Sequence, residues 1–131
     1  STKGTSTTAP ALKVQAATAL ARQMVSALDF DIDGELQADV ALDPSAAEIK
    51  LPEQERKDPA DVLIFPSLDA AHISLKLLQH LGGAQNYGQL ICGLKRPAGQ
   101  VPRTASEETI LGTAAALGVE AIKFHELYPR G

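Results

Sequence analysis

Several residue types that define common classes of protein are scarce in this sequence. Its 131 residues include one cysteine, no tryptophan and only 4% aromatic side chains. A single cysteine excludes a disulfide framework and indicates a reducing compartment, which we expect to be the cytoplasm. No run of about 18 apolar residues is present, and the first residues lack the basic-then-apolar order of a signal peptide, so no membrane contact is expected.

Basic residues are too few and too scattered for a nucleic-acid-binding surface. The chain has 12 Lys and Arg against 16 Asp and Glu, a formal net charge of -4 and a pI near 5.3. Binding to a duplex depends on a concentrated basic patch, so nucleic acid is not an expected partner. The 44% apolar content is ordinary for a globular chain that builds a core.

Two groups of potential metal ligands lack the spacing of a metal site. His72, His80 and His125 have neither the spacing nor the carboxylate partners of a zinc site, and the first two are expected on a helix surface. The acidic residues between positions 31 and 39 lack the order of a calcium loop. We interpret them as a solvated turn followed by a helix start, and no metal is expected.

Apolar residues recur at helical spacing in three parts of the chain. The pattern over residues 12–28 predicts a helix that Thr8 caps, and a shorter helical pattern covers residues 37–42. A third helix is predicted after residues 66–67, and the pair at 82–83, both glycine, is expected to end it.

Three short segments between these helices have the composition of strands. Residues 30–33 alternate apolar and acidic side chains, whereas residues 62–65 and 89–94 are apolar runs typical of strands buried on both faces. Cys92 lies in the last run and is expected to be a core thiol. The alternation of strands and helices predicts a layered αβα fold of the α/β class with a mainly parallel sheet.

The segment from Gly93 to Glu108 combines a strand end, a basic pair, a loop and a helix start. Arg103 comes immediately before the predicted helix, and Thr104 with Glu107 three residues later has the pattern of a capping box. A helix N-terminus offers unpaired N–H groups, and an arginine beside it can bind a phosphate through two parallel hydrogen bonds. The segment therefore predicts an anion site.

Several short motifs follow one another in a characteristic order. They are Ser1 to Gly4, Asp33 to Asp39, Ala60 to Pro66, Leu81 to Gly83 and Gly93 to Pro97. In this order they resemble the C-terminal part of the phosphate acetyltransferases (phosphotransacetylases), and the similarity covers nearly the whole chain. The resemblance implies a two-domain α/β enzyme, a homodimer, that moves an acetyl group between coenzyme A and phosphate in a cleft between its domains. Coenzyme A is then a substrate, and neither a metal nor a tightly bound cofactor is implied.

The resemblance also implies that this chain is a fragment of a longer enzyme and is inactive alone. Residues 1–94 would belong to the second α/β domain. Residues 103–131 would form a terminal helical segment that packs on the missing N-terminal domain, which would supply the other wall of the cleft.

The resemblance assigns roles to residues around the predicted anion site. In the family the matching loop reads Ser-Arg, with an Asp in the following helix, for transition-state stabilisation, phosphate binding and proton removal. Arg103 aligns with the arginine, whereas Pro102 and Thr109 occupy the serine and aspartate positions. Arg103 is therefore expected to bind phosphate, with Thr104 donating a hydroxyl.

A base for the thiol proton is expected among the first residues of the helix. Glu107 or Glu108 would take that role from the first helical turn. The alternative is that Thr104 and Glu107 form only a capping box and that Glu108 is only a favourable helix-start carboxylate.

Further residues are candidates for substrate contact. Lys95 and Arg96 are expected either to meet the phosphates of coenzyme A or to be solvated surface cations. Tyr87 lines the cleft or closes it. The remaining candidates are the loop residues Ser1, Thr2, Lys3 and Gly4, which have the composition of a phosphate-contacting loop.

Two classes of function are therefore open. The first is a phosphate acetyltransferase that forms or uses acetyl phosphate. The alternative is a non-catalytic domain of transacylase descent that senses acetyl-CoA or holds dimers together, since the Ser and Asp pattern is absent.

Overall fold

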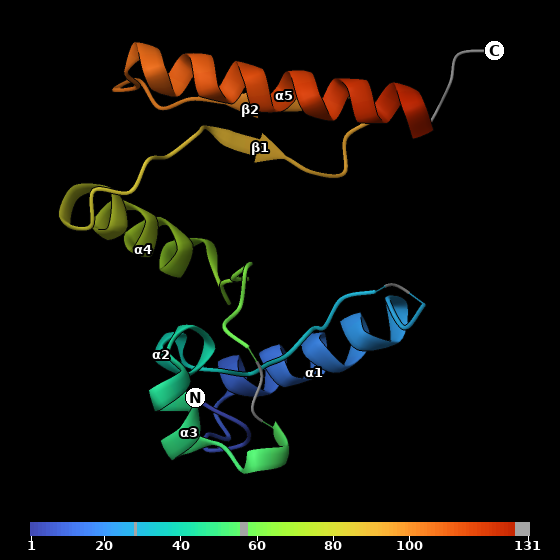
Figure 1. The fold of residues 1–131 in the computed structure, drawn as a ribbon, viewed down its shortest axis with the longest axis vertical. Helices are drawn as coiled ribbons and strands as arrows, with labels where there is room; N and C mark the ends of the chain where they lie inside the picture. Colours follow the sequence, from blue (N-terminus) through green and yellow to red (C-terminus); the bar gives the residue numbers. More distant parts are fainter. Residues whose placement is uncertain (28, 56–57, 128–131) are drawn as a thin grey trace. The chain divides into compact units, whose positions relative to one another are not determined.

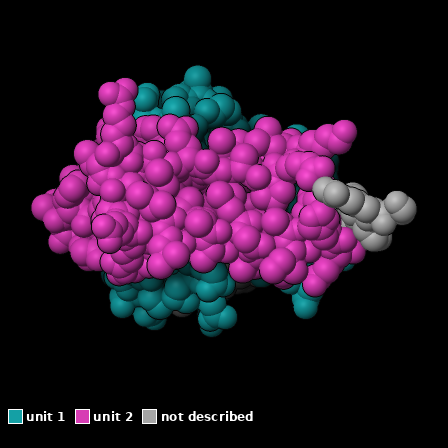
Figure 2. Space-filling view, turned by 90° about the horizontal axis from the view of Figure 1, so that it is seen from above, with its two compact units in different colours: residues 1–70 teal, residues 71–131 magenta. Residues whose placement is uncertain are grey.

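The computed structural model describes residues 1–27, 29–55 and 58–127, which fall into two compact units. Unit 1 is Ser1–Ala70 and unit 2 is Ala71–Gly131, coloured separately in Figure 2. In chain order the elements are α1 (Ala9–Met24), α2 (Ala38–Leu42), α3 (Pro44–Lys50), the 3-10 turn η1 (Glu53–Glu55), α4 (Leu68–Leu81), β1 (Gln89–Ile91), β2 (Ala98–Gln100) and α5 (Glu107–Leu127). Figure 1 shows this order along the chain.

Helix α1 follows the predicted helical pattern and starts where it was expected. Thr8 occupies the N-cap position with extended backbone, although its side chain makes no capping hydrogen bond. A proline in the first turn supports the start because proline has no N–H to leave unpaired there. The predicted end at residue 28 lies outside the described residues, and the helix as described ends at Met24.

Helices α2 and α3 build the small apolar core of unit 1. Val40, Ala47 and Leu51 are buried against one another, with Leu36 packed on them. The carboxylate of Asp43 accepts a hydrogen bond from the N–H of Ser45 at 2.8 Å and so caps α3.

Unit 2 contains a β-hairpin that lies along helix α5 (Figure 1). Strands β1 and β2 are antiparallel, with Leu90 opposite Gly99. Glycines allow the hairpin to approach the helix. A Cβ built on Gly99 would lie 3.0 Å from Cδ1 of Leu117, and one on Gly88 would lie 2.4 Å from Cγ2 of Thr113.

The mainly parallel sheet expected from the sequence is not found among the described residues. Their sheet is the antiparallel pair β1–β2. Residues 30–33 and 62–65 join no strand, and Val62 and Ile64 are 75% and 89% exposed. A strand exists only when a neighbour pairs with its backbone, and composition does not supply that neighbour. The fold is still α/β, with helices and a small sheet.

The chain exposes far more surface than its mass would suggest. Its accessible surface is 10236 Å². A folded monomer of this mass exposes about 6,600 Å², and two separate units of half the mass would expose about 8,000 Å² together.

Cys92, expected in the core, is exposed in the turn after β1. Among the described residues, no helix combines the length and apolar character that a membrane crossing requires.

Candidate functional site

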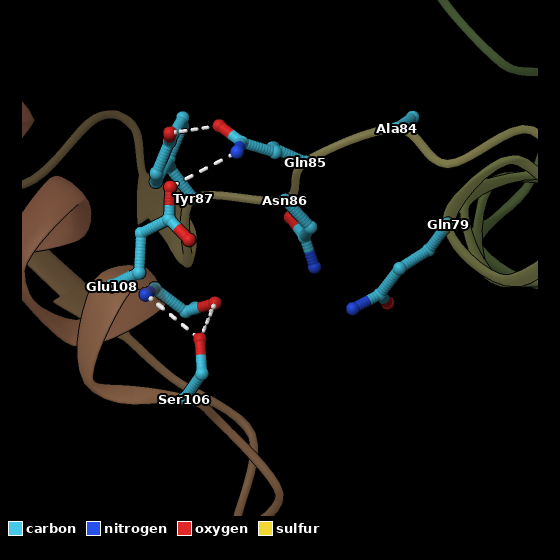
Figure 3. Close-up of a pocket in the computed structure, with 8 residues that line it drawn as sticks. Gln79, Ala84, Gln85, Asn86, Tyr87, Ser106 and Glu108 are labelled. Carbon is cyan, nitrogen blue, oxygen red and sulfur yellow. Dashed lines mark hydrogen bonds between the residues drawn. The ribbon is translucent and has the colours of Figure 1, made fainter.

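A polar pocket of about 160 Å³ lies in unit 2 at the start of helix α5. Its lining combines one residue of α4, the loop before β1 and residues at the start of α5: Gln79, Ala84, Gln85, Asn86, Tyr87, Ser106, Glu108 and Thr109. Figure 3 labels all of these except Thr109. Two of the residues predicted for the site, Tyr87 and Glu108, therefore meet here. Thr109 lines the same pocket.

The carboxylate of Glu108 is held in the pocket by side chains of the loop before β1. The amide nitrogen of Gln85 donates to Oε1 of Glu108 at 2.9 Å, and the hydroxyl of Tyr87 donates to the amide oxygen of Gln85. These bonds are dashed in Figure 3. One Glu108 oxygen is thus occupied by a neutral donor, which orients the carboxylate without neutralising it.

Tyr87 reaches this position because residue 112 of α5 is a glycine. A Cβ on Gly112 would lie 2.2 Å from ring carbons Cδ1 and Cε1 of Tyr87, too close for any real contact. The ring therefore lies directly over the helix backbone. The pocket wall depends on the absence of a side chain at this position.

Helix α5 is capped by Ser106, which corrects the predicted capping box. The helix begins at Glu107, so Glu107 occupies its first turn and cannot be the third residue after a cap at Thr104. The Ser106 hydroxyl accepts from the N–H of Thr109 at 3.2 Å and lies 3.1 Å from the Thr109 hydroxyl. Thr104 lies in a turn in which the N–H of Ala105 donates to the carbonyl of Pro102 at 3.0 Å.

The predicted phosphate-binding cations lie outside this pocket. Arg103 and Thr104 are exposed in the turn before α5, and Lys95 and Arg96 are exposed in the connection between β1 and β2. Glu108 is the charged residue among those that line the pocket. A carboxylate without a cation repels a free anion, so the pocket itself favours neutral hydrogen-bonding groups.

The predicted loop Ser1 to Gly4 lies in unit 1 and is tied to residues 33–37. Ser1 donates its hydroxyl hydrogen to Oε2 of Glu35, and the N–H of Gly4 donates to Oε1 at 2.9 Å. Thr2 is only 4% exposed; its hydroxyl accepts from the N–H of Gln37 at 3.1 Å. Lys3 forms an ion pair of 2.5 Å with Asp33.

These contacts shift the acid–base behaviour of the two carboxylates. Hydrogen bonds donated first by Ser1 and then by Gln15 and Gly4 lower the pKa of Glu35, although its burial opposes the shift. Burial also raises the pKa of Asp33, but bonds from Lys3 and Gly34 and the charges of Lys3 and Arg22 outweigh it and leave that pKa lowered. Both groups are therefore ionised at neutral pH.

Sequence reasoning missed the residues that give both places their shape. The side-chain amides of Gln79, Gln85 and Asn86 carry no chemical pattern that marks them. Glu35 was interpreted as part of a solvated acidic turn, yet it is 4% exposed. The sequence did contain a signal: the Ser-Thr-Lys-Gly loop offers hydrogen-bond donors, and the acidic segment offers acceptors. Only the structure shows that the two segments lie next to each other.

No cluster of metal ligands is found in the described part of the chain, and the cation that lines a hollow in unit 1 is already paired. Within it, no group of three or more His, Cys, Asp or Glu side chains is arranged to hold a metal. A hollow of about 270 Å³ in unit 1 includes Arg22 in its lining. That guanidinium already donates to the carbonyl of Ile32 at 2.7 Å and pairs with Asp33.

Comparison with known protein families decides where this chain belongs. The family model described as phosphate acetyl/butaryl transferase matches residues 1–117. This chain is a member of that family. The phosphate acetyltransferase of Acetivibrio thermocellus is 44% identical over 109 residues, 83% of this chain and 32% of that protein. That of Bacillus subtilis is 35% identical over 122 residues, 93% of this chain and 37% of that protein.

Solved structures of family members have the same fold over this region. EutD phosphotransacetylase from Staphylococcus aureus matches 95% of the chain with a TM-score of 0.79 and 36% identity. A phosphotransacetylase from Streptococcus pyogenes matches 94% with a TM-score of 0.83 and 34% identity. This family member spans 37% of each of those two chains.

Proposed function

We propose that the protein carrying this chain is a phosphate acetyltransferase, which interconverts acetyl-CoA plus phosphate with coenzyme A plus acetyl phosphate. The observation that carries the proposal is the carboxylate of Glu108, which Gln85 holds in a polar pocket at the start of α5, the helix that follows the turn carrying Arg103. Family membership supports the same reaction. Coenzyme A is a substrate in this scheme, and no bound cofactor takes part.

The proposed chemistry uses one base and one cation. The thiol of coenzyme A loses its proton to Glu108, and the sulfur attacks the carbonyl carbon of acetyl phosphate. The carbon–oxygen bond to phosphate breaks, and Arg103 stabilises the charge on the leaving phosphate. Thr104 donates its hydroxyl at the same turn. In the reverse direction Glu108 returns the proton to the thiol.

The surrounding residues complete the proposed substrate site. Lys95 and Arg96 are assigned to the phosphates of coenzyme A, and Tyr87 forms a wall of the pocket. The loop of Ser1, Thr2, Lys3 and Gly4 is also assigned to substrate contact, since Ser1 and Gly4 are exposed.

The large exposed apolar surface supports a role for further polypeptide. Apolar side chains such as Val62, Ile64 and Leu81 are 75%, 89% and 82% exposed. Surfaces of this kind are covered in stable proteins. We assign their cover to the region corresponding to the larger part of the relatives, which would also pair with residues 62–65 in a mainly parallel sheet. In this arrangement residues 1–94 belong to one domain and residues 103–131 pack on the other.

The same proposal places the complete enzyme in the cytoplasm as a homodimer. This chain alone is then inactive, because it carries one wall of the cleft.

An assay of the full protein tests the assignment. The intact protein should form acetyl phosphate from acetyl-CoA and phosphate, and Arg103→Ala should lower kcat by roughly 100- to 1,000-fold. Glu108→Gln, which removes the proposed base, should lower kcat by roughly 100- to 10,000-fold. Lys123→Ala is the matched control, because Lys123 is an exposed cation on α5 away from the pocket. Full activity of Arg103→Ala would refute the phosphate-binding role.

A second function is favoured by one feature of the sequence. Pro102 and Thr109 stand at the family positions of the serine and aspartate, so a non-catalytic acetyl-CoA-sensing or dimerisation domain is the alternative. Calorimetric binding of acetyl-CoA to the intact protein without turnover would establish this alternative in place of the enzyme.

A further inference from the structure

The carboxylate of Glu35 joins the first loop, helix α1 and residues 33–37 through its hydrogen bonds. The carboxylate of Asp33 joins the same three parts, because it pairs with Lys3 of the loop and Arg22 of α1. The carboxylate of Glu35 accepts hydrogen bonds from the hydroxyl of Ser1, the N–H of Gly4 and the amide nitrogen of Gln15, the last two at 2.9 and 3.0 Å. Glu35 itself is 4% exposed. A buried carboxylate is stable only where donors such as these satisfy it.

The backbone of the first loop also depends on this partner. Lys3 and Gly4 have positive φ angles of 45° and 80°. A left-handed conformation at a non-glycine residue costs free energy, so contacts outside the loop must hold it. The N–H of Lys3 donates to the main-chain carbonyl of Glu35 at 3.0 Å, next to the side-chain contact that Gly4 makes.

The loop's own donors are consumed by these contacts. The N–H of Thr2 donates to the hydroxyl of Thr5 at 3.0 Å, and the N–H of Thr5 donates to the carbonyl of Thr2 at 3.2 Å. The ammonium of Lys3 is paired with Asp33. The inner face of the loop is therefore filled by the protein's own carboxylates, and only its outer face is open to a ligand.

We propose that Glu35 is a positioning residue, which holds the Ser1–Gly4 loop and helix α1 in the arrangement that presents the outer face of the loop to coenzyme A. This proposal rests on the function proposed above for the identity of the substrate. The holding of the loop by the Glu35 side chain rests on the contacts alone.

Hydrogen exchange at two neighbouring amides can distinguish whether Glu35 holds the whole loop or makes only a local contact. The N–H of Gly4 is bonded to the side chain of Glu35, whereas the N–H of Lys3 is bonded to its main chain. In Glu35→Ala of the full protein, residue-resolved hydrogen exchange should accelerate at both amides, because the whole loop leaves its position. Acceleration at Gly4 alone would overturn the proposal. Glu53→Ala, which removes another carboxylate of unit 1, should leave both amides unchanged.

Enzyme kinetics of the same variants test the link to substrate. Glu35→Ala should raise the KM for coenzyme A by roughly 10- to 100-fold, more than it lowers kcat, since displacing a binding loop weakens positioning without removing a reacting group. Glu35→Gln keeps an acceptor oxygen for Gly4 and Gln15 and should restore most of the affinity. An unchanged KM in Glu35→Ala would overturn the proposal.

The proposed function and the positioning role of Glu35 can be refuted separately. If the intact protein shows no transferase activity, the proposed function is refuted, and the exchange of the two amides alone decides whether Glu35 holds the loop. If Glu35→Ala does not fold, Glu35→Gln provides the comparison. Positioning by geometry is supported if amide exchange at Lys3 and Gly4 is unchanged and the KM for coenzyme A stays within a factor of about three of the parent. A loosened loop in that variant would overturn it.

Discussion

The two units of this chain fix the geometry of their loops by different physical means. In unit 1, hydrogen bonds and an ion pair hold the Ser1–Gly4 loop against Glu35 and Asp33. In unit 2, glycines let Tyr87 and the hairpin approach helix α5 more closely than any side chain would permit. The first arrangement depends on charge and protonation, whereas the second depends on volume. Changes in pH and changes in side-chain size should therefore affect different units.

The largest effect is expected where a glycine of unit 2 carries both backbone strain and close contact. Gly88 has φ of +57° and a Cβ there would lie 2.4 Å from Thr113, whereas Gly93 has φ of +79° and open space around it. Gly88→Ala should destabilise the protein by about 2–5 kcal/mol, the sum of strain and overpacking. Gly93→Ala should cost only the strain, about 1–2 kcal/mol. Urea denaturation measures the difference, and equal costs would show that the hairpin relaxes away from α5.

A second pair of glycines tests the wall of the pocket. Gly112→Ala should destabilise by about 1–3 kcal/mol, because its methyl group would overlap the ring of Tyr87. Gly118→Ala on the same helix meets nothing within 4 Å and should stabilise by about 0.5–1 kcal/mol. Thermal unfolding of the two variants and the near-ultraviolet signal of tyrosine provide the measurement. A stabilising Gly112→Ala would contradict the position of Tyr87.

Helix caps give a smaller effect and compare the units directly. Ser106 accepts a hydrogen bond from Thr109, whereas Thr8 at the start of α1 makes no capping bond with its side chain. Ser106→Ala should destabilise by about 1 kcal/mol, and Thr8→Ala by much less. Thr104→Ala should also have little effect, and a cost equal to that of Ser106→Ala would restore the capping box predicted from the sequence. Denaturant midpoints of the three variants decide between these results.

Acidic pH should weaken the contacts that hold the Ser1–Gly4 loop in unit 1, whereas pH changes near neutrality should have no effect on them. The pKa values of Asp33 and Glu35 lie below their ordinary values of 3.8 and 4.5 in the folded chain. Their contribution to stability is therefore complete above those ordinary values and is lost as the pH falls through the lowered values. Amide exchange at Lys3 and Gly4, followed from neutral pH to below pH 4, should report this loss after correction for intrinsic exchange. The part of the loss due to Glu35 should disappear in Glu35→Ala, and the part due to Asp33 should remain. An acid response as large as that of the parent would contradict a contribution from Glu35.

The sequence predicted the helices better than the sheet, for a physical reason. Helices α1 and α4 follow from local periodicity and from punctuation such as Gly82, which a single segment carries. Helix α5 was predicted from a capping pattern at its start, and the cap proved to be a different residue. The apolar run at residues 62–65 has strand composition but no partner strand among the described residues. Strand formation depends on a second segment, and nothing in the run itself specifies which one.

The candidate site divides in the same way. Tyr87 and Glu108 were predicted from their place in the chain, and both line the pocket. Ser106 was missed as the cap because Thr104, two residues earlier, fits the sequence pattern equally well. The contacts of Glu35 were missed because its donors, Ser1, Gly4 and Gln15, lie 34, 31 and 20 residues away in the chain. An acidic cluster in the sequence does not show that one of its carboxylates is buried.

The exposed thiol of Cys92 can report whether further polypeptide covers this part of the chain. It is the single cysteine of the sequence and lies in the turn that follows strand β1. In this chain a thiol reagent therefore modifies one known position, and the rate of modification at Cys92 reflects how accessible that turn is. Slower modification in the intact protein than in this chain would identify the edge of the hairpin as a surface that further polypeptide covers, without any need to detect the substrate.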